Sequence, residues 1–162
     1  MAAFPIQSKQ RLAEVPFIYR FIATGFFSGY APVAPGTAGS ALALAFLLIP
    51  SFASVWTIVP VTCVMFVLGG ISAEHAERVL GQDPSAVTVD EVVGMWLSLW
   101  FVPVTLWTAA AAFFIFRFFD IVKPFPARYF DRKSGGWMIM LDDVAAAVYT
   151  NLVLQLALRI FS

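Results

Sequence analysis

The stretch ALALAFLLIPSFASVWTIVPVTCVMFVLGGI, residues 41–71, has no charged side chain and is interrupted by Pro50-Ser51. Proline disrupts a helix interior because it lacks an N–H donor and its ring clashes with the preceding turn. The interruption leaves apolar pieces at residues 41–49 and 52–71. About 20 apolar residues are needed for one helical crossing of a bilayer, so the first piece is too short.

The composition of the whole chain is that of a membrane protein. Of the 162 residues, 60% are hydrophobic and 12% charged, and the mean hydropathy is +0.84. A typical soluble domain has roughly 25% charged residues. Ten basic and ten acidic residues cancel, which argues against a nucleic-acid partner. By length, residues 1–162 form a single domain.

Two further apolar runs follow the first. Residues 92–116 are uncharged and divided at Pro103, and residues 144–158 form the last run. The lengths of these pieces predict helices, several of them too short to span a bilayer. We therefore expect an all-α fold, a compact membrane-associated bundle with short or broken hydrophobic helices.

Charged residues gather in three islands, up to residue 20, at 74–91 and at 117–143. The first and third islands are rich in Lys and Arg, which places them, including the N-terminal segment 1–20, in the cytoplasm. One crossing by each of the first two runs would put the middle island on the opposite side. Hairpins at Pro50 and Pro103, partly re-entrant, would keep all three islands together.

Two acidic doublets, Asp90-Glu91 and Asp142-Asp143, each stand before an apolar run. One carboxylate in each doublet could cap a helix. Four carboxylates at one surface repel each other unless a cation neutralises them, and oxygen ligands select a hard ion such as Mg²⁺. Which member of each doublet binds the ion is left open, with a preference for Asp143.

Two more acids and several bases stand close to these doublets. Glu74 and Asp120 lie at the ends of apolar runs, as further ligands or a general base. Arg117 and Lys123 flank Asp120 at helical spacing and suit a phosphate. The other basic residues of this island, Arg128, Arg132 and Lys133, could bind substrate or simply meet anionic lipid headgroups.

The stretch APVAPGTAGS, residues 31–40, precedes the first apolar helix. Gly36 and Thr37 offer a small backbone and a hydroxyl, which suit a phosphate at a helix N-terminus. The lysine of a P-loop is missing, so a plain helix-entry turn is the alternative. A two-histidine mechanism is excluded because His75 is the only histidine.

Four motifs occur in a characteristic order: TGFFSGYAPVAPGTAGS (24–40), VDEVVGMW (89–96), FRFFDIVKPFPARYFDR (116–132) and GGWMIMLDDVAA (135–146). Through them the chain resembles the phosphatidylglycerophosphatase A family. The resemblance implies a Mg²⁺-dependent phosphatase of the bacterial inner membrane. It would remove the terminal phosphate of phosphatidylglycerophosphate to give phosphatidylglycerol, with its active site facing the cytoplasm.

The resemblance also assigns roles to residues. Catalytic roles would fall to Thr37, Glu74, Asp120 and Lys123. Substrate binding would fall to Thr37, Arg117 and Lys123, and metal binding to Glu74, Asp90, Glu91, Asp142 and Asp143. Gly36 and Arg128 join the substrate-binding candidates because of their residue types and their positions within these motifs. Attack on phosphorus by water and a covalent intermediate both stay open, as does assembly into a homo-oligomer.

The alternative function is a small membrane transporter or ion-binding subunit, in which buried acids would carry a proton or cation across the bilayer. The acids of this chain stand at the ends of its apolar runs, which favours chemistry at the membrane surface.

Overall fold

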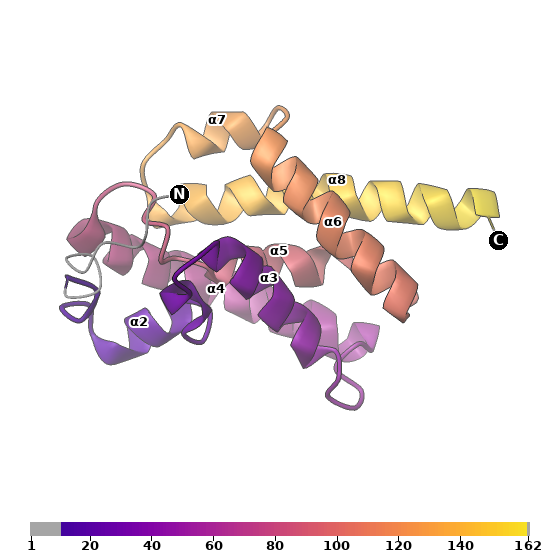
Figure 1. The fold of residues 1–162 in the computed structure, drawn as a ribbon, viewed down its shortest axis with the longest axis horizontal. Coiled ribbons are helices and arrows are strands. Elements are labelled where there is room, and N and C mark those ends of the chain that lie inside the picture. The colour runs from indigo at the N-terminus through magenta and orange to yellow at the C-terminus, as the bar shows by residue number, and fades with distance from the viewer. Residues whose placement is uncertain (1–10, 162) are drawn as a thin grey trace.

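The computed structural model describes residues 11–161, and within them helices are the only regular secondary structure (Figure 1). In chain order these are α2 (Phe17–Ala23), the 3₁₀ helix η1 (Ser28–Tyr30), α3 (Pro35–Phe46), α4 (Val55–Leu80), α5 (Val89–Ser98), α6 (Leu106–Val122), α7 (Ala127–Asp131) and α8 (Gly136–Phe161). The predicted all-helical fold is confirmed. Residues 1–10, half of the segment predicted to be cytoplasmic, lie outside the described residues.

The chain turns where the two prolines predicted a break. Pro50 lies in the turn between α3 and α4, and Pro103 lies in the connection between α5 and α6. After the second turn, Thr105 and Thr108 form a capping box, in which each side-chain oxygen accepts the other residue's backbone N–H. This box satisfies donors that would otherwise be free at the start of α6.

Two helices are longer than the sequence predicted. α4 continues beyond residue 71 to Leu80, through alanine, glutamate and arginine residues that favour helix. α8 begins at Gly136 instead of near residue 144. The residues before the second doublet are helical because they enter the core, where Ile139 and Met140 are buried.

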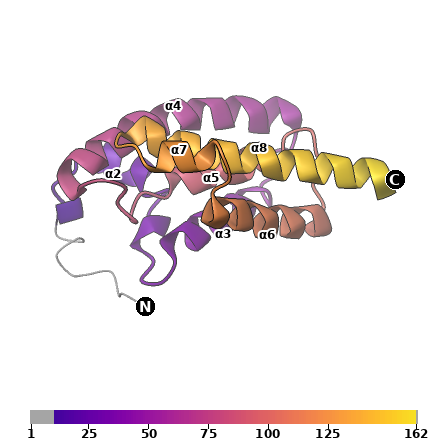
Figure 2. The same ribbon diagram turned by 90° about the horizontal axis from the view of Figure 1, so that it is seen from above.

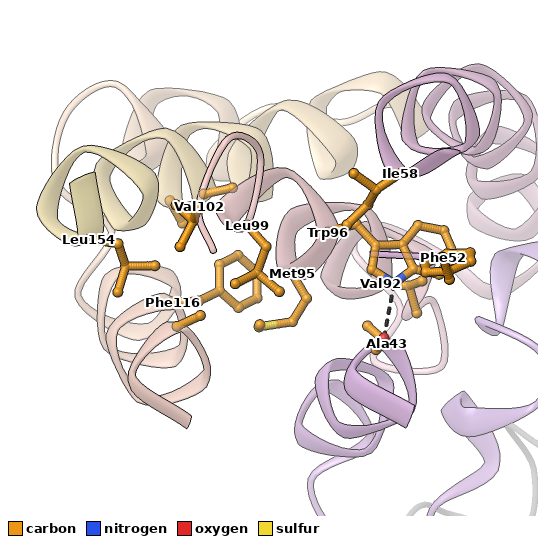
Figure 3. Close-up of a cluster of buried hydrophobic side chains, with 13 residues drawn as sticks. Ala43, Phe52, Ile58, Val92, Met95, Trp96, Leu99, Val102, Phe116 and Leu154 are labelled. Atoms are coloured by element: carbon orange, nitrogen blue, oxygen red, sulfur yellow. Dashed lines mark hydrogen bonds between the residues drawn. The ribbon is translucent and has the colours of Figure 1, made fainter. Parts of the chain in front are cut away.

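Helix α5 forms the centre of the molecule. It contacts α3, α4, α6 and α8, and Figure 2 shows it between α4 on one side and α3 and α6 on the other. Trp96 is almost fully buried, and its indole N–H donates to the carbonyl of Ala43 over 3.0 Å (Figure 3). Met95, Leu99 and Phe116 continue this cluster. A helix covered on nearly all sides requires apolar residues all around, as α5 has after its acidic first turn, from Val92 to Leu97.

The charged ends of the helices meet at one end of the molecule. Glu91 at the start of α5 lies 3.8 Å from Arg117 near the end of α6. Glu74 near the end of α4 accepts the backbone N–H of Gly136 at the start of α8 over 2.8 Å. We call this the polar end. It brings together charged residues of the second and third islands of the sequence.

The opposite end contains the two proline turns, which have no charged residue, and the end of α8, where Arg159 lies close to Phe101 and Pro103. Large apolar side chains are exposed there, with Leu48, Trp56 and Trp107 each more than 80% accessible. Among the described residues, α4 and α8 are long and apolar enough to cross a membrane, by length and composition. Cys63, on α4, is exposed.

Candidate active site

Five carboxylates from three helices meet at the polar end. Asp90 and Glu91 lie in the first turn of α5, Asp120 lies near the end of α6, and Asp142 and Asp143 lie in the second turn of α8. Oxygens of Asp90, Glu91 and Asp143 approach within 4.8 Å of one another, and so do those of Asp120, Asp142 and Asp143. We call these five residues the carboxylate cluster. Asp143 is the member common to both groups.

The cluster is buried and only partly satisfied by the protein. Asp90, Asp142 and Asp143 are less than 10% exposed. One buried oxygen each of Asp90, Glu91, Asp142 and Asp143 accepts no hydrogen bond. Buried carboxylates without partners are costly, and most native ones are paired or coordinate a metal. The oxygen-only donor set therefore fits a hard divalent cation such as Mg²⁺.

Burial changes the acidity of the first doublet. It raises the pKa of Glu91 to about 8, although the hydrogen bond with Asp90 and the charge of Arg117 act in the opposite direction. Burial also raises the pKa of Asp90, and the neighbouring charge of Glu91 adds to the shift. Without a cation, both groups thus retain protons more strongly than ordinary carboxyls do.

Two basic side chains reach the cluster. Arg117 Nη1 lies 2.7 Å from Asp120 Oδ2, as their spacing along α6 predicted. Lys123 Nζ contacts Asp142 and also lies 2.6 Å from Asp131 Oδ1. Burial would lower the pKa of Lys123, but the hydrogen bonds to Asp131 and Asp142 outweigh it and raise that pKa. The lysine is therefore a permanent cation beside the cluster.

Gly36, the first of the two glycines in the stretch APGTAGS, is required by a close approach to this cluster. A Cβ atom on Gly36 would lie 2.1 Å from Glu91 Oε1 and 3.0 Å from Arg117 Nη1. Pro35 and Gly36 open α3, and Thr37 follows in its first turn, half-buried. The structure thus brings the start of α3 against the first doublet and Arg117.

Sequence comparison identifies what kind of chain carries this cluster. Residues 21–158 match the model of the family described as phosphatidylglycerophosphatase A. The chain belongs to this family. The resemblance seen in its motifs is therefore confirmed.

Three relatives span most of the chain. The phosphatidylglycerophosphatase A of Escherichia coli is 37% identical over 134 residues, 80% of this chain and 77% of the relative. That of Haemophilus influenzae is 40% identical over 136 residues, 82% and 83% of the two chains. A Bacteroides thetaiotaomicron protein with the provisional name phosphatidylinositol-3-phosphatase is 43% identical over 150 residues, 87% and 94%. No solved structure matches the chain significantly.

These relationships make this chain an enzyme of the phosphatase class. Together with the apolar helices α4 and α8, they suggest membrane association, and the cluster lies where the family motifs converge. Of the residues predicted for the family site, Gly36, Asp90, Glu91, Arg117, Asp120, Lys123, Asp142 and Asp143 come together at this point.

Glu74 and Arg128 have other surroundings. One oxygen of Glu74 accepts the Gly136 N–H, and the other lies 3.3 Å from Arg78, so Glu74 holds the start of α8. The guanidinium of Arg128 is exposed and donates to the carbonyl of Val122 over 3.3 Å. The structure does not bring either side chain into the carboxylate cluster.

The capping interpretation fails for the second doublet and finds no support in the first. Asp142 and Asp143 lie inside α8, whose first residue is Gly136, so they cannot cap its start. α5 is preceded by Thr88 and has no side-chain cap, while Asp90 and Glu91 occupy its first turn. Their carboxylates near a helix N-terminus still interact favourably with the helix dipole.

Sequence reasoning missed Asp131, which pairs with Lys123 from α7. No helical period links the two residues, because α6 ends at Val122 and a loop intervenes. The only signal was the presence of an acid among the bases of the third island.

Proposed function

We propose that this protein is a Mg²⁺-dependent phosphatase that hydrolyses phosphatidylglycerophosphate to phosphatidylglycerol and inorganic phosphate. The observation that carries the proposal is the carboxylate cluster, whose four unpartnered buried oxygens lie beside Arg117 and Lys123. Family membership and the names of the relatives support the reaction class and the lipid substrate.

The ion would be held by Asp90, Glu91 and Asp143, whose oxygens lie within 4.8 Å of one another, and Asp142 would support it from the second group, which shares Asp143. When bound, Mg²⁺ supplies positive charge that stabilises the phosphoryl oxygens. Those carboxylates of the cluster that are ionised would otherwise repel a phosphate, and a bound cation would offset this repulsion.

The protein's own side chains provide the rest of the chemistry. Lys123 and Arg117 neutralise charge on the transferring phosphoryl group, which is the main requirement for phosphoryl transfer. A new phosphorus–oxygen bond forms to the nucleophile, the phosphorus–oxygen bond to glycerol breaks, and the glycerol oxygen takes the proton that the nucleophile has lost. If Thr37 is the nucleophile, a water molecule then hydrolyses the phosphothreonine and releases inorganic phosphate. We assign Asp120 as the group that accepts a proton from the attacking hydroxyl, which belongs to water or to Thr37.

The remaining predicted residues take supporting roles. Gly36 allows α3 to approach Glu91 and Arg117 closely. Glu74 positions α8, and with it the second doublet, through its bond to Gly136. In the cell, the positive-inside rule puts the polar end with its bases in the cytoplasm of a bacterium, facing the inner leaflet of the inner membrane.

A second substrate is worth measuring because the Bacteroides relative is named for phosphatidylinositol 3-phosphate. Purified protein in detergent should release phosphate from phosphatidylglycerophosphate with Mg²⁺, and EDTA should abolish the release. Phosphatidylinositol 3-phosphate is assayed in parallel. Faster turnover of the inositol lipid would reassign the substrate, and phosphate release unaffected by EDTA would overturn the metal requirement.

A further inference from the structure

A pocket of about 530 Å³ adjoins the carboxylate cluster. It is formed by the end of α6, the loop after it, and α7, which packs on α8 (Figure 1). Lys123 belongs to both places, because it lines the pocket and contacts Asp142 of the cluster. A molecule that filled the pocket would therefore have one end beside the cluster.

The loop that shapes this pocket is tied to α8. Lys123 ends α6 in a left-handed conformation, with φ of 49°. Tyr149 of α8 donates its hydroxyl to the carbonyl of Phe125 over 2.6 Å. The second doublet lies two turns earlier on the same helix, so pocket and cluster share a rigid support.

The pocket has a basic part and an apolar part. Arg128, Arg132 and Lys133 line it, and their side chains are exposed. The nearby acid Asp131 is paired with Lys123, so it does not neutralise these three bases. Apolar walls come from Val122, Pro124 and Phe125, of which Phe125 is 79% exposed.

This combination suits an anionic group attached to an aliphatic body. Phosphatidylglycerophosphate has two phosphates, a terminal monoester and a diester that joins the headgroup to diacylglycerol. Phosphatidylinositol 3-phosphate has the same two kinds of phosphate. Phosphatidic acid has only the monoester, attached directly to diacylglycerol.

We propose that the pocket lined by Arg128, Arg132 and Lys133 binds the phosphodiester of the lipid substrate while the terminal phosphate occupies the carboxylate cluster. The assignment rests on the proposed function and adds the basis of its selectivity: the enzyme would prefer lipid phosphomonoesters that carry a second, diester-linked phosphate. Phe125 and Val122 would contact the start of the acyl chains.

The first test measures binding without turnover. Titration calorimetry in detergent compares short-chain dioctanoyl phosphatidylglycerol, dioctanoylglycerol and inorganic phosphate. Wild-type protein should bind the phosphatidylglycerol most tightly. The triple variant Arg128→Gln, Arg132→Gln, Lys133→Gln should bind it on the order of 100-fold more weakly, since each base near a phosphate contributes about fivefold.

A matched control is Arg78→Gln, which removes an exposed base at the polar end but outside the pocket. It should leave the dissociation constant for phosphatidylglycerol unchanged. Equal affinity for dioctanoylglycerol and phosphatidylglycerol in the wild type would overturn the phosphodiester site. If the wild type bound inorganic phosphate as tightly as phosphatidylglycerol, and the triple variant lost this binding, the pocket would be reassigned as a site for free phosphate.

The second test measures selectivity in turnover. The triple variant should lose about 100-fold in kcat/KM for phosphatidylglycerophosphate, mainly through KM, and keep its rate on phosphatidic acid. An equal loss on both lipids would mean that the bases only attract the membrane, which contradicts the proposal. Failure of the proposed function is distinguishable, because wild-type protein would then release no phosphate yet still bind dioctanoyl phosphatidylglycerol.

Discussion

At the scale of single residues, Asp143 is the member of the cluster that joins its two groups of ligands. The residue is 3% exposed, and one of its carboxylate oxygens has no partner in the protein. A charge in this position is unfavourable until a cation arrives. Replacing Asp143 should therefore stabilise the metal-free protein and, at the same time, lower the enzyme's activity.

Replacing Asp143 with Asn tests this expectation. The variant should lose at least about 100-fold in kcat, because loss of a metal ligand costs more than loss of an outer partner. In EDTA its melting temperature should rise, since repulsion within the cluster decreases. Thermal melting with and without Mg²⁺ measures the second effect. A lower melting temperature in EDTA together with full activity would contradict the bridging role.

The first doublet predicts how stability depends on pH. Burial raises the pKa of Glu91 from 4.5 to about 8, so the folded protein binds this proton more tightly than the unfolded chain does. The resulting stabilisation is fully present below pH 4.5 and disappears as pH rises through about 8. In EDTA, the melting temperature should therefore fall between pH 5 and 8.

Two controls belong to this measurement. Saturating Mg²⁺ should reduce the fall, because the cation replaces the proton as the partner of the carboxylates. Glu91→Gln should flatten the curve, since glutamine does not titrate. A curve that is equally steep in wild-type protein and in Glu91→Gln would show that the doublet is not its cause.

At the scale of helices, the sequence could predict where apolar runs break but not where every helix begins. Pro50 and Pro103 act locally, so their turns were predictable. The start of α8 depends on contacts with distant segments: Gly136 meets Glu74, and Met140 is buried against Gly69 of α4. Such contacts leave no periodic signal near the doublet.

The same reasoning explains which site residues were predictable. Arg117 and Asp120 are one turn apart on α6, so their ion pair follows from helical geometry. The different surroundings of Glu74 follow from the close approach of α4 and α8, where a Cβ on Gly136 would lie 2.1 Å from the Glu74 nitrogen. Only the assembled fold contains that information.

Substitution of Glu74 separates a positioning role from metal binding. Glu74→Ala removes the acceptor for the Gly136 N–H, a loss comparable to that of a helix cap, about 1 kcal/mol of stability. Glu74→Gln keeps an acceptor and should retain most of the activity and stability. Chemical denaturation and phosphate release measure the two effects. Loss of Mg²⁺ binding in Glu74→Gln, as large as in Asp143→Asn, would make Glu74 a ligand instead.

At the scale of the whole molecule, the two ends of the bundle differ in chemistry. The polar end contains the carboxylate cluster and the bases around it, whereas the opposite end has uncharged turns and exposed Trp56 and Trp107. Uncharged turns with exposed apolar side chains are stable in the hydrocarbon of a bilayer, whereas charged groups such as those of the polar end are not. The bundle should thus be inserted by the end that carries the proline turns, with the cluster at the depth of the lipid headgroups.

This orientation predicts that the loop before α5 and the loop before α8 lie in the same compartment. Ser85, before α5, and Ser134, before α8, are exposed positions of the second and third charged islands. Single cysteines at these positions, in a background with exposed Cys63 replaced by alanine, should react with a membrane-impermeant maleimide only after the inner membrane is opened. Labelling of Ser85→Cys from the outer face of intact cells, with Ser134→Cys protected, would instead require complete single crossings. It would separate the first doublet from the second across the bilayer, which is incompatible with a structure in which oxygens of Asp90 and Glu91 lie within 4.8 Å of Asp143.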